Sequence, residues 1–286
     1  MGKIVIVGSG PAGCSAALYA ARAGQEVVVI SMGMGALSKA ELIQNYYGFE
    51  EGITGAELYR QGVAGAKAVG AEFITAEVVG LDYTGSLVVQ TTEGDYPADA
   101  VILATGTGRI APKIAGLAEH EGRGVSYCAT CDAFFYRGKT AAVLGSGEYA
   151  LHEVQALLPL AGKVILCTNG EPLTADFPEG VEICTEKLAA VEGEEKVSAL
   201  RLENGELLPV EGLFVALGVA GSAALARKLG APVENGRIVV DEKMQTGIPG
   251  LFAAGDCTGG MLQVCKAVYE GALAATEAIK QIRGKK

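Results

Sequence analysis

The chain has 286 residues, a formal net charge of −10 and a sequence pI near 4.9, which argues against a basic surface for nucleic acid. Its length predicts two domains, and half of its residues are hydrophobic, with 41 glycines and no tryptophan. This composition is typical of an α/β protein with buried parallel strands and glycine turns. We expect no signal peptide, because the first residues read directly as a strand, and no membrane span, because the longest apolar run (212–226) is short and glycine-rich.

The first motif is a glycine turn between a strand and a helix. Residues 3–7 are predicted as a strand, 14–23 as an alanine-rich helix and 26–31 as the next strand, and the turn Gly8-Ser9-Gly10-Pro11-Ala12-Gly13 lies between the first two. A G-x-G-x-x-G turn in this context indicates dinucleotide binding, because its backbone can approach a pyrophosphate and the helix N-terminus donates N–H groups. The acidic residue expected after the second strand is absent, since Ser31 and Met32 stand there.

A long connection follows at 33–53 and contains Asn45-Tyr46-Tyr47-Gly48-Phe49. Loops of this length are usually functional, but packing of the aromatic residues under the loop is an equal alternative. A helix is predicted from Thr54 or Gly55 through Val69, with Glu57 placed as in a capping box. Short strands are predicted near 72–75, 77–82 and 86–91, and then a buried strand that ends in Ala104-Thr105-Gly106.

The stretch Cys128-Ala129-Thr130-Cys131-Asp132 contains two cysteines at C-x-x-C spacing. We interpret it as a redox-active pair, because a cytoplasmic C-x-x-C is more often catalytic than structural. Half of a zinc site and inert core cysteines are the alternatives; His120 is nearby, but a second C-x-x-C is absent, and we expect no metal. Asp132 could donate and accept protons for thiol chemistry or could cap a helix.

The second half of the chain repeats the first in shortened form. A strand at 140–144, the turn Gly145-Ser146-Gly147-Glu148-Tyr149-Ala150, a helix to about 160 and a strand at 163–167 form a second βαβ unit. Short strands recur between 181 and 208, and 213–218 resembles the strand before Gly106. The chain closes with Ala254-Gly255-Asp256 and a helix predicted from about 261 to 282.

Taken in order, the first glycine turn, Ala104-Thr105-Gly106, the Cys-Ala-Thr-Cys-Asp motif and Ala254-Gly255-Asp256 resemble the low-molecular-weight thioredoxin reductases over essentially the whole chain. The resemblance implies an α/β fold of two dinucleotide-binding domains, each Rossmann-like with three ββα layers, the second inserted in the first. Residues 1–114 and 240–286 would form an FAD-binding domain. Residues 115–239 would form a redox-disulfide domain that resembles a degenerate NADPH-binding domain.

The resemblance also assigns roles to residues. Cys131 would lie nearer the flavin, Cys128 would attack the partner disulfide, and Asp132 would protonate the departing thiolate. The glycines of the first turn would hold the FAD pyrophosphate, Asp256 would lie near the ribityl chain and phosphates, and Gln263 with the Val264 N–H would face the isoalloxazine. The expected FAD-binding residues are Gly8, Gly10, Pro11, Ala12, Gly13, Asn45, Ala104, Thr105, Gly106, Gly255, Asp256, Gln263 and Val264.

The sequence departs from the family where NADPH would bind. Family members hold its 2′-phosphate with an arginine-rich stretch after the second strand of the second βαβ unit. Here that stretch, 167–173, contains no basic residue, and Glu171 would repel a phosphate. Losing two or three charge-assisted hydrogen bonds of about 1.5–3 kcal/mol each weakens binding by roughly 10² to 10⁴-fold or more. NADH is not favoured either, because positions 168 and 169 carry no carboxylate.

This pattern, together with the Asn45–Phe49 loop and the second glycine turn, resembles the ferredoxin-dependent flavin thioredoxin reductases. We therefore expect reduced ferredoxin to pass electrons through FAD to the Cys128–Cys131 pair, which then reduces thioredoxin by thiol–disulfide exchange. The resemblance further implies a cytoplasmic homodimer.

Three other functions remain open from the sequence. They are an NAD(P)H-dependent thioredoxin or glutaredoxin-type reductase, a dithiol oxidase that passes electrons to oxygen, and a non-catalytic redox sensor. The remaining cysteines are expected to be small buried residues without chemistry, although Cys257 should lie near the flavin; they are Cys14, Cys167, Cys184, Cys257 and Cys265.

Overall fold

The computed structural model describes residues 2–106, 114–218 and 221–284, apart from the side chain of Cys131. It divides into two compact units: one comprises Met1–Gly108 and Gly221–Lys286, and the other is Arg109–Ala220, inserted in the first along the chain. Residues 221–239 therefore belong to the first unit, whereas the sequence suggested that the second extended to 239. The reason is a set of contacts within the first unit, in which Ser222 bonds to Thr105 and the Lys228 ammonium donates to the Val79 carbonyl.

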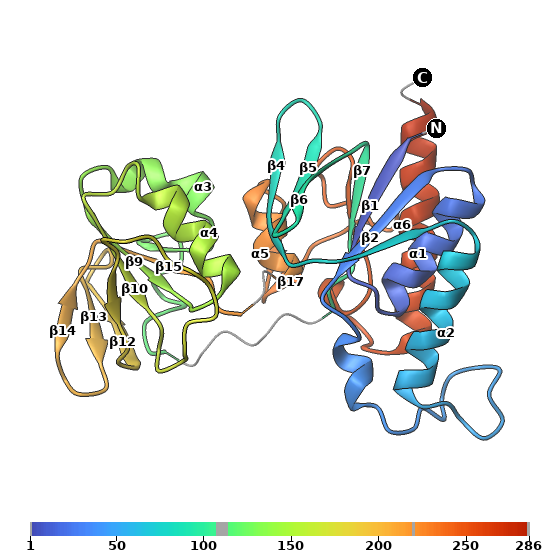
Figure 1. Cartoon of the computed structure of the whole chain (residues 1–286), viewed down its shortest axis with the longest axis horizontal. Helices are drawn as coiled ribbons and strands as arrows, with labels where there is room; N and C mark the ends of the chain where they lie inside the picture. Colours follow the sequence, from blue (N-terminus) through green and yellow to red (C-terminus); the bar gives the residue numbers. More distant parts are fainter. Residues whose placement is uncertain (1, 107–113, 219–220, 285–286) are drawn as a thin grey trace. The chain divides into compact units, whose positions relative to one another are not determined.

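The first unit is built on a five-stranded sheet in the order β18-β7-β1-β2-β3, in which every pair is parallel. Helices α1 and α6 lie side by side along it and α2 packs against α1 (Figure 1). The core consists of buried Val and Ile from the strands and alanines from α1 and α6. The strands are β1 (Lys3–Val7), β2 (Glu26–Ser31), β3 (Glu72–Thr75), β7 (Ala100–Leu103) and β18 (Leu251–Ala253), and the helices are α1 (Pro11–Arg22), α2 (Gly55–Ala68) and α6 (Val264–Gly284).

An antiparallel meander completes the first unit. It comprises β4 (Val78–Tyr83), β5 (Leu87–Thr91) and β6 (Gly94–Ala98). The short helix α5 (Ser222–Lys228) packs against β4, and a small ribbon of β16 (Val233–Glu234) and β17 (Arg237–Ile238) follows it. The sequence did not predict β6, α5 or this ribbon, because each is short and lacks a sustained hydrophobic period.

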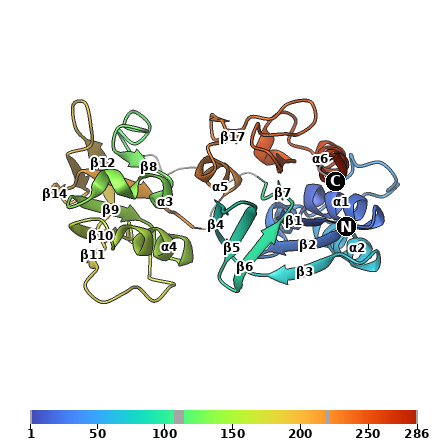
Figure 2. The same ribbon diagram turned by 90° about the horizontal axis from the view of Figure 1, so that it is seen from above.

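The second unit has a parallel sheet in the order β11-β10-β9-β15-β8 and its own antiparallel meander, β12-β13-β14 (Figure 2). Helix α4 packs against β9 and β10, and α3 packs against α4. The parallel strands are β8 (Val125–Ser126), β9 (Thr140–Leu144), β10 (Lys163–Cys167), β11 (Glu182–Cys184) and β15 (Gly212–Val215); the meander is β12 (Leu188–Glu192), β13 (Ala199–Leu202) and β14 (Leu207–Pro209); the helices are α3 (Ala129–Asp132) and α4 (Glu148–Leu157).

The predicted duplication and fold class are confirmed. Each unit runs strand, glycine turn, helix and strand, then a meander and a strand that returns beside the first. The glycine turns also match, because a Cβ added at Gly8 would lie 2.3 Å from the Ala104 oxygen and one at Gly145 would lie 2.2 Å from the Ala216 oxygen. The copies differ between their second and third strands, where the first unit has α2 and the described chain of the second unit, 168–181, has no helix.

Three helix boundaries differ from the sequence prediction by three residues. Helix α1 begins at Pro11 instead of Cys14, since proline is well suited to a first helical position. Helix α4 ends at Leu157 instead of about 160. Helix α6 begins at Val264, so Met261 and Gln263 precede it. Among the described helices, none combines the length and the apolarity that crossing a bilayer requires.

Candidate functional site

The C-x-x-C motif lies in the second unit, where the short strand β8 leads into the one-turn helix α3. Cys128 is 4% exposed and disulfide-bonded, which agrees with the redox-pair interpretation. The side chain of Cys131, its expected partner, lies outside the described residues. The Asp132 N–H donates to the Cys128 carbonyl at 3.1 Å, so the motif closes on itself as one helical turn.

Ser126 connects Asp132 to the cysteine backbone. Its hydroxyl donates to Asp132 Oδ2 at 2.7 Å and accepts from the Cys128 N–H at 3.1 Å. The Asp132 carboxylate is thus directed back toward Ser126, two residues before the first cysteine. Burial, and after it the negative charge of Asp132, raise the pKa of Tyr136. No sequence pattern indicated Ser126, because a lone serine before a C-x-x-C has no distinctive spacing.

A buried carboxylate from α4 lies behind the motif. Glu153 is fully buried, and its Oε2 accepts a short hydrogen bond from the Ala129 N–H at the start of α3. Its Oε1 lies 3.3 Å from Nδ1 of His152. Because a buried carboxylate needs such partners, Glu153 fixes α3 against α4. Sequence reasoning missed it, since a glutamate inside a predicted amphipathic helix reads as a solvent-facing residue.

Two aromatic rings beside the motif are exposed. Phe134 and Phe135 follow Asp132 in a short 3-10 helix and are 65% and 67% exposed. The Arg137 guanidinium lies 5.4 Å from the centre of the Phe134 ring. Adjacent exposed aromatic residues next to a reactive group are typical of a surface that binds another protein.

The glycine turn of the first unit forms an open cradle at the N-terminus of α1. A Cβ added at Gly10 would have no heavy atom of the described chain within 4 Å. The first turn of α1 carries no acidic residue, so its free N–H groups favour an anion. Ser31, the last residue of β2, stands where an acidic residue was expected. Its hydroxyl donates to Ser9 Oγ at 2.7 Å and so joins the end of β2 to the glycine turn.

The turn at Gly255-Asp256 lies against the same helix. Gly255 has φ of 86°, and a Cβ there would come within 2.9 Å of the Ala12 Cβ, so only glycine fits. The Gly255 N–H donates to Glu270 Oε2 at 2.8 Å, while Lys266 Nζ donates to the Gly255 carbonyl at 2.8 Å and pairs with Glu270 at 2.9 Å. This buried ion pair of α6 holds the turn in place, and no sequence pattern indicated it.

Other predicted FAD-binding residues also meet within the first unit. The Asn45 amide donates to Gln263 Oε1 at 2.8 Å, which joins the long loop to the residue before α6. Thr105 Oγ1 lies 2.6 Å from Ser222 Oγ. The packing interpretation of the loop holds in part, because Tyr46 and Phe49 stack at 6.0 Å while Tyr47 is 97% exposed. The functional interpretation stays a prediction. A shallow cavity of about 610 Å³ lies along residues 44–50.

Of the cysteines described in the first unit, Cys14 and Cys257 are buried, as expected, whereas Cys265 on α6 is exposed, contrary to the expectation. Burial raises the pKa of Cys14 to about 12, and its thiol donates to the Ser9 carbonyl. Burial likewise raises the pKa of Cys257 to about 11, and its thiol donates to backbone carbonyls. A raised pKa disfavours the reactive thiolate form of both buried cysteines.

Comparison with known proteins defines the class of this chain. A family model of the pyridine nucleotide-disulphide oxidoreductases matches residues 2–271, and the chain belongs to this family. Within it, the chain is 36% identical to the thioredoxin reductase of Aquifex aeolicus, an alignment that covers 99% of this chain and 94% of the relative. It is 33% identical to the thioredoxin reductase of Listeria innocua, with 98% and 93% covered.

Solved structures of two thioredoxin reductases superpose on this chain. The atypical thioredoxin reductase TRi from Desulfovibrio vulgaris Hildenborough superposes with a TM-score of 0.93 at 40% identity, with 99% of each chain covered. A ferredoxin-flavin thioredoxin reductase from Clostridium acetobutylicum superposes with a TM-score of 0.75 at 35% identity, covering 99% of this chain and 98% of the other. The chain is a thioredoxin reductase-like disulfide oxidoreductase.

FAD is the cofactor of such proteins, and the first unit fits it. The open space above Gly10 and the unopposed N–H groups of α1 suit a pyrophosphate. The Gly255-Asp256 turn lies beside Ala12 of the first glycine turn, so the two turns expected to hold the cofactor are adjacent.

Proposed function

We propose that this protein reduces thioredoxin with electrons that reduced ferredoxin, and not NADPH, delivers to its FAD and from there to the Cys128–Cys131 pair. The observation that carries the proposal is the state of the second glycine turn, where a nicotinamide dinucleotide would bind.

That turn is covered by the chain itself. The Thr174 N–H donates to the Ser146 carbonyl at 2.8 Å, and a Cβ added at Gly147 would lie 3.0 Å from Thr174 Oγ1. At the equivalent Gly10 the same position is open. A pyrophosphate must contact the backbone of such a turn directly. Segment 173–178 therefore occupies space that the nucleotide would need, and it would have to move before NADPH could bind.

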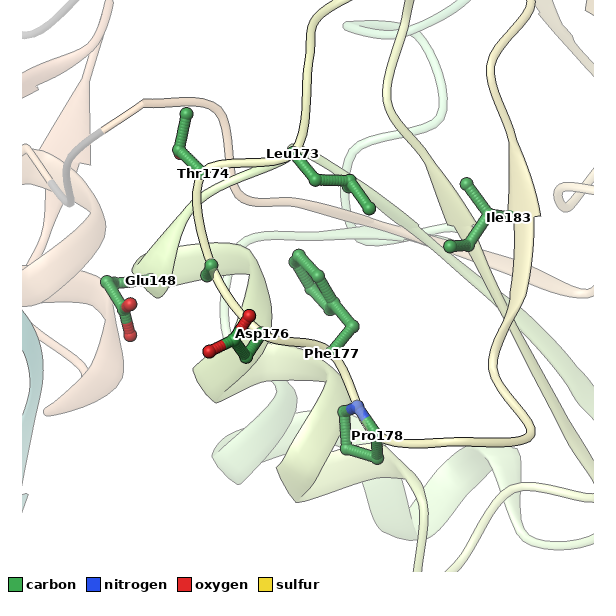
Figure 3. A pocket seen from close by; sticks show the side chains of 8 residues that line it. Glu148, Leu173, Thr174, Asp176, Phe177, Pro178 and Ile183 are labelled. Carbon is green, nitrogen blue, oxygen red and sulfur yellow. The ribbon is translucent and has the colours of Figure 1, made fainter.

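The surroundings of this turn are acidic. Glu148 is the first residue of α4, and Figure 3 shows its carboxylate facing the same cavity as Asp176, while the Phe177 ring points toward Leu173. The cavity of about 580 Å³ is lined by Glu148, Leu173, Thr174, Ala175, Asp176, Phe177, Pro178 and Ile183, none of which is basic. Carboxylates at a helix N-terminus compete with a phosphate for the same N–H groups and repel it.

The expected 2′-phosphate site is poor as well. Asn169 uses its side-chain oxygen to accept from the Leu188 N–H, and Glu171 follows it. The side chain of Lys187 does pack against Gly170, so one cation lies at this edge although the local sequence carries none. One exposed lysine stands in place of the two or three charge-assisted hydrogen bonds of an arginine-rich stretch. We therefore expect NADPH to bind roughly 10²-fold or more weakly than it binds a site with that stretch.

Because the second glycine turn is unsuited to a nicotinamide dinucleotide, we infer that ferredoxin is the electron donor. The Clostridium acetobutylicum protein, named a ferredoxin-flavin thioredoxin reductase, superposes well on this chain, whereas most relatives are named simply thioredoxin reductases. Bound FAD would supply the redox centre, since a flavin can accept electrons singly and pass them on in pairs.

The chain's own residues then carry out the exchange. After two electrons have opened the disulfide, the Cys128 thiolate attacks one sulfur of the thioredoxin disulfide and forms a mixed disulfide. The thiolate released from thioredoxin takes a proton from Asp132, which the Ser126 hydroxyl holds beside the motif. Cys131 then attacks Cys128, restores the internal disulfide and frees reduced thioredoxin. Phe134 and Phe135 provide the apolar surface on which thioredoxin docks.

The test is an anaerobic assay of thioredoxin reduction with reduced ferredoxin, NADPH or NADH as the only donor. We expect turnover with ferredoxin, and at least 10²-fold lower kcat/KM with either nicotinamide. The Cys128→Ser variant should lose thioredoxin reduction while its flavin is still reduced by ferredoxin. Efficient turnover with NADPH would refute the proposal. A reduced flavin that does not reduce thioredoxin, and that is reoxidised when oxygen is then admitted, would favour a dithiol oxidase. Sedimentation of the FAD-loaded protein tests the homodimer that the resemblance implies.

A further inference from the structure

A second pair of cysteines lies in the second unit, away from the C-x-x-C motif in sequence. Cys167 ends β10 and Cys184 ends β11, and the two residues are register partners in parallel strands. Register partners place their side chains on the same face of the sheet. The two thiols therefore lie on one side of the sheet, close enough for each to perturb the pKa of the other. Cys167 is buried, as the sequence suggested, whereas Cys184 is partly exposed.

The spacing of the strands allows a disulfide. Neighbouring strands lie about 4.8 Å apart, which falls within the range of roughly 4.4–6.8 Å between the Cα atoms of bridged cysteines. The Thr168 N–H donates to the Cys184 carbonyl at 2.9 Å and continues the ladder past both cysteines. Both thiols are free in this structure. No large backbone movement is therefore required to join them.

The two sulfurs have different environments. Cys167 is fully buried in the core below the meander, whereas Cys184 is partly exposed on β11, the edge strand of the sheet (Figure 2). The adjacent Cys167 thiol, and after it the Glu186 backbone, lower the pKa of Cys184 to about 6. The neighbouring Cys184, followed by burial, raises the pKa of Cys167. An accessible thiolate beside a buried thiol is the asymmetry that dithiol exchange needs.

We propose that Cys184 and Cys167 form a second thiol–disulfide exchange site, which takes a small neutral or cationic disulfide as its oxidant. The Cys184 thiolate attacks one sulfur of the small disulfide, forms a mixed disulfide and expels a thiolate. Cys167 then gives up its proton and attacks the Cys184 sulfur, which forms the Cys167–Cys184 bond and expels the second thiolate. Two electrons pass from the pair to the small disulfide, and one proton is released.

The charge preference follows from the groups around Cys184. Glu182 and Glu186 both act on its sulfur, while Lys163 pairs with Glu182 at 2.7 Å and Lys187 lies against Gly170. Lys163 offsets the charge of Glu182, so Glu186 is the carboxylate that disfavours an anionic reagent at Cys184. One unit charge at about 6 Å in water changes the rate by about threefold.

The site can be observed in a single peptide. Trypsin cleaves after Lys163 and Lys187, and no lysine or arginine lies between them, so residues 164–187 are released together with both cysteines. The FAD-loaded chain, with no electron donor present, is treated with cystamine, quenched with iodoacetamide under denaturing conditions and digested. We expect this peptide to lose two hydrogens and to carry neither alkyl groups nor cysteamine.

Two variants separate the steps. Cys167→Ser should stop at the cysteamine adduct of Cys184, and Cys184→Ser should leave Cys167 unmodified. Cys265, which is exposed on α6, is the control thiol within the same chain. At pH 6 a thiol of pKa near 6 has about 500 times more thiolate than one of pKa 9, and its lower nucleophilicity reduces this advantage to about 15–30-fold.

The test compares the rates at which Cys184 and Cys265 react with cystamine. Faster reaction of Cys184 than Cys265 with cystamine, and closure onto Cys167, would support the site. Reaction at Cys184 no faster than at Cys265, or an adduct that persists in the unaltered chain without closure, would overturn it. Faster reaction with the anionic glutathione disulfide than with cystamine would overturn the assigned charge preference. Because no donor takes part, these results are independent of whether ferredoxin reduces the flavin.

Discussion

Replacing Lys266 tests whether the buried ion pair of α6 holds the Gly255-Asp256 turn. The Lys266 and Glu270 side chains are 14% and 12% exposed, and Lys266 Nζ donates to Thr258 Oγ1 at 2.8 Å, in addition to its bonds with Gly255 and Glu270. Lys266→Met removes one partner and leaves a buried carboxylate uncompensated, which costs about 3–5 kcal/mol. For a unit of this size, the expected fall in Tm is about 6–20 °C.

The assay is thermal unfolding of the FAD-loaded protein, with flavin retention on gel filtration as a second measurement. Arg60→Met on α2 is the control in the same unit, because its pair with Glu57 is i,i+3 and the two side chains are 67% and 41% exposed. An exposed pair contributes about 0–1 kcal/mol. If Lys266→Met destabilises the protein no more than Arg60→Met, the ion pair does not hold the turn.

Three other predictions concern the second unit. Ser126→Ala should lower kcat for thioredoxin by about 10–100-fold, since Asp132 loses a charge-assisted hydrogen bond, and leave the rate of flavin reduction unchanged; an unchanged kcat would contradict this role. Phe134→Ala should raise KM for thioredoxin about tenfold, while Tyr83→Ala, which alters another exposed ring, should not; equal effects would argue against docking at Phe134. Alkylation of Cys184 should reach half its maximal rate near pH 6 and level off above pH 7, because its thiolate forms at low pH; a rate that still rises between pH 8 and 9 would show an ordinary thiol.

The parts of the fold that the sequence predicted are local. Continuous apolar runs such as 3–7 and 140–144 predict buried parallel strands, and a glycine turn between strand and helix marks each βαβ unit. The family comparison confirms the class that these motifs indicated. The Thr54 cap was also readable, because its side chain accepts from the Glu57 N–H three residues away.

The parts that the sequence did not predict depend on contacts between distant segments. Thr174, which follows β10 in the chain, covers Gly147. Ser222 bonds to Thr105, and this contact places 221–239 in the first unit. Glu153 reads as a surface residue of α4 until Ala129 is seen to bond to it. Cys167 and Cys184 become a pair only through the register of β10 and β11. No periodicity or short motif encodes these relationships.

Whether the second unit binds a nicotinamide donor can be measured in an anaerobic visible spectrum of the FAD-loaded protein. The flavin absorbance is followed while NADPH, NADH and reduced ferredoxin are added in separate titrations. We expect bleaching by reduced ferredoxin and no rapid bleaching by either nicotinamide at micromolar concentration. Rapid bleaching by micromolar NADPH would contradict this expectation, and would mean that segment 173–178 moves off the second glycine turn to admit the nucleotide.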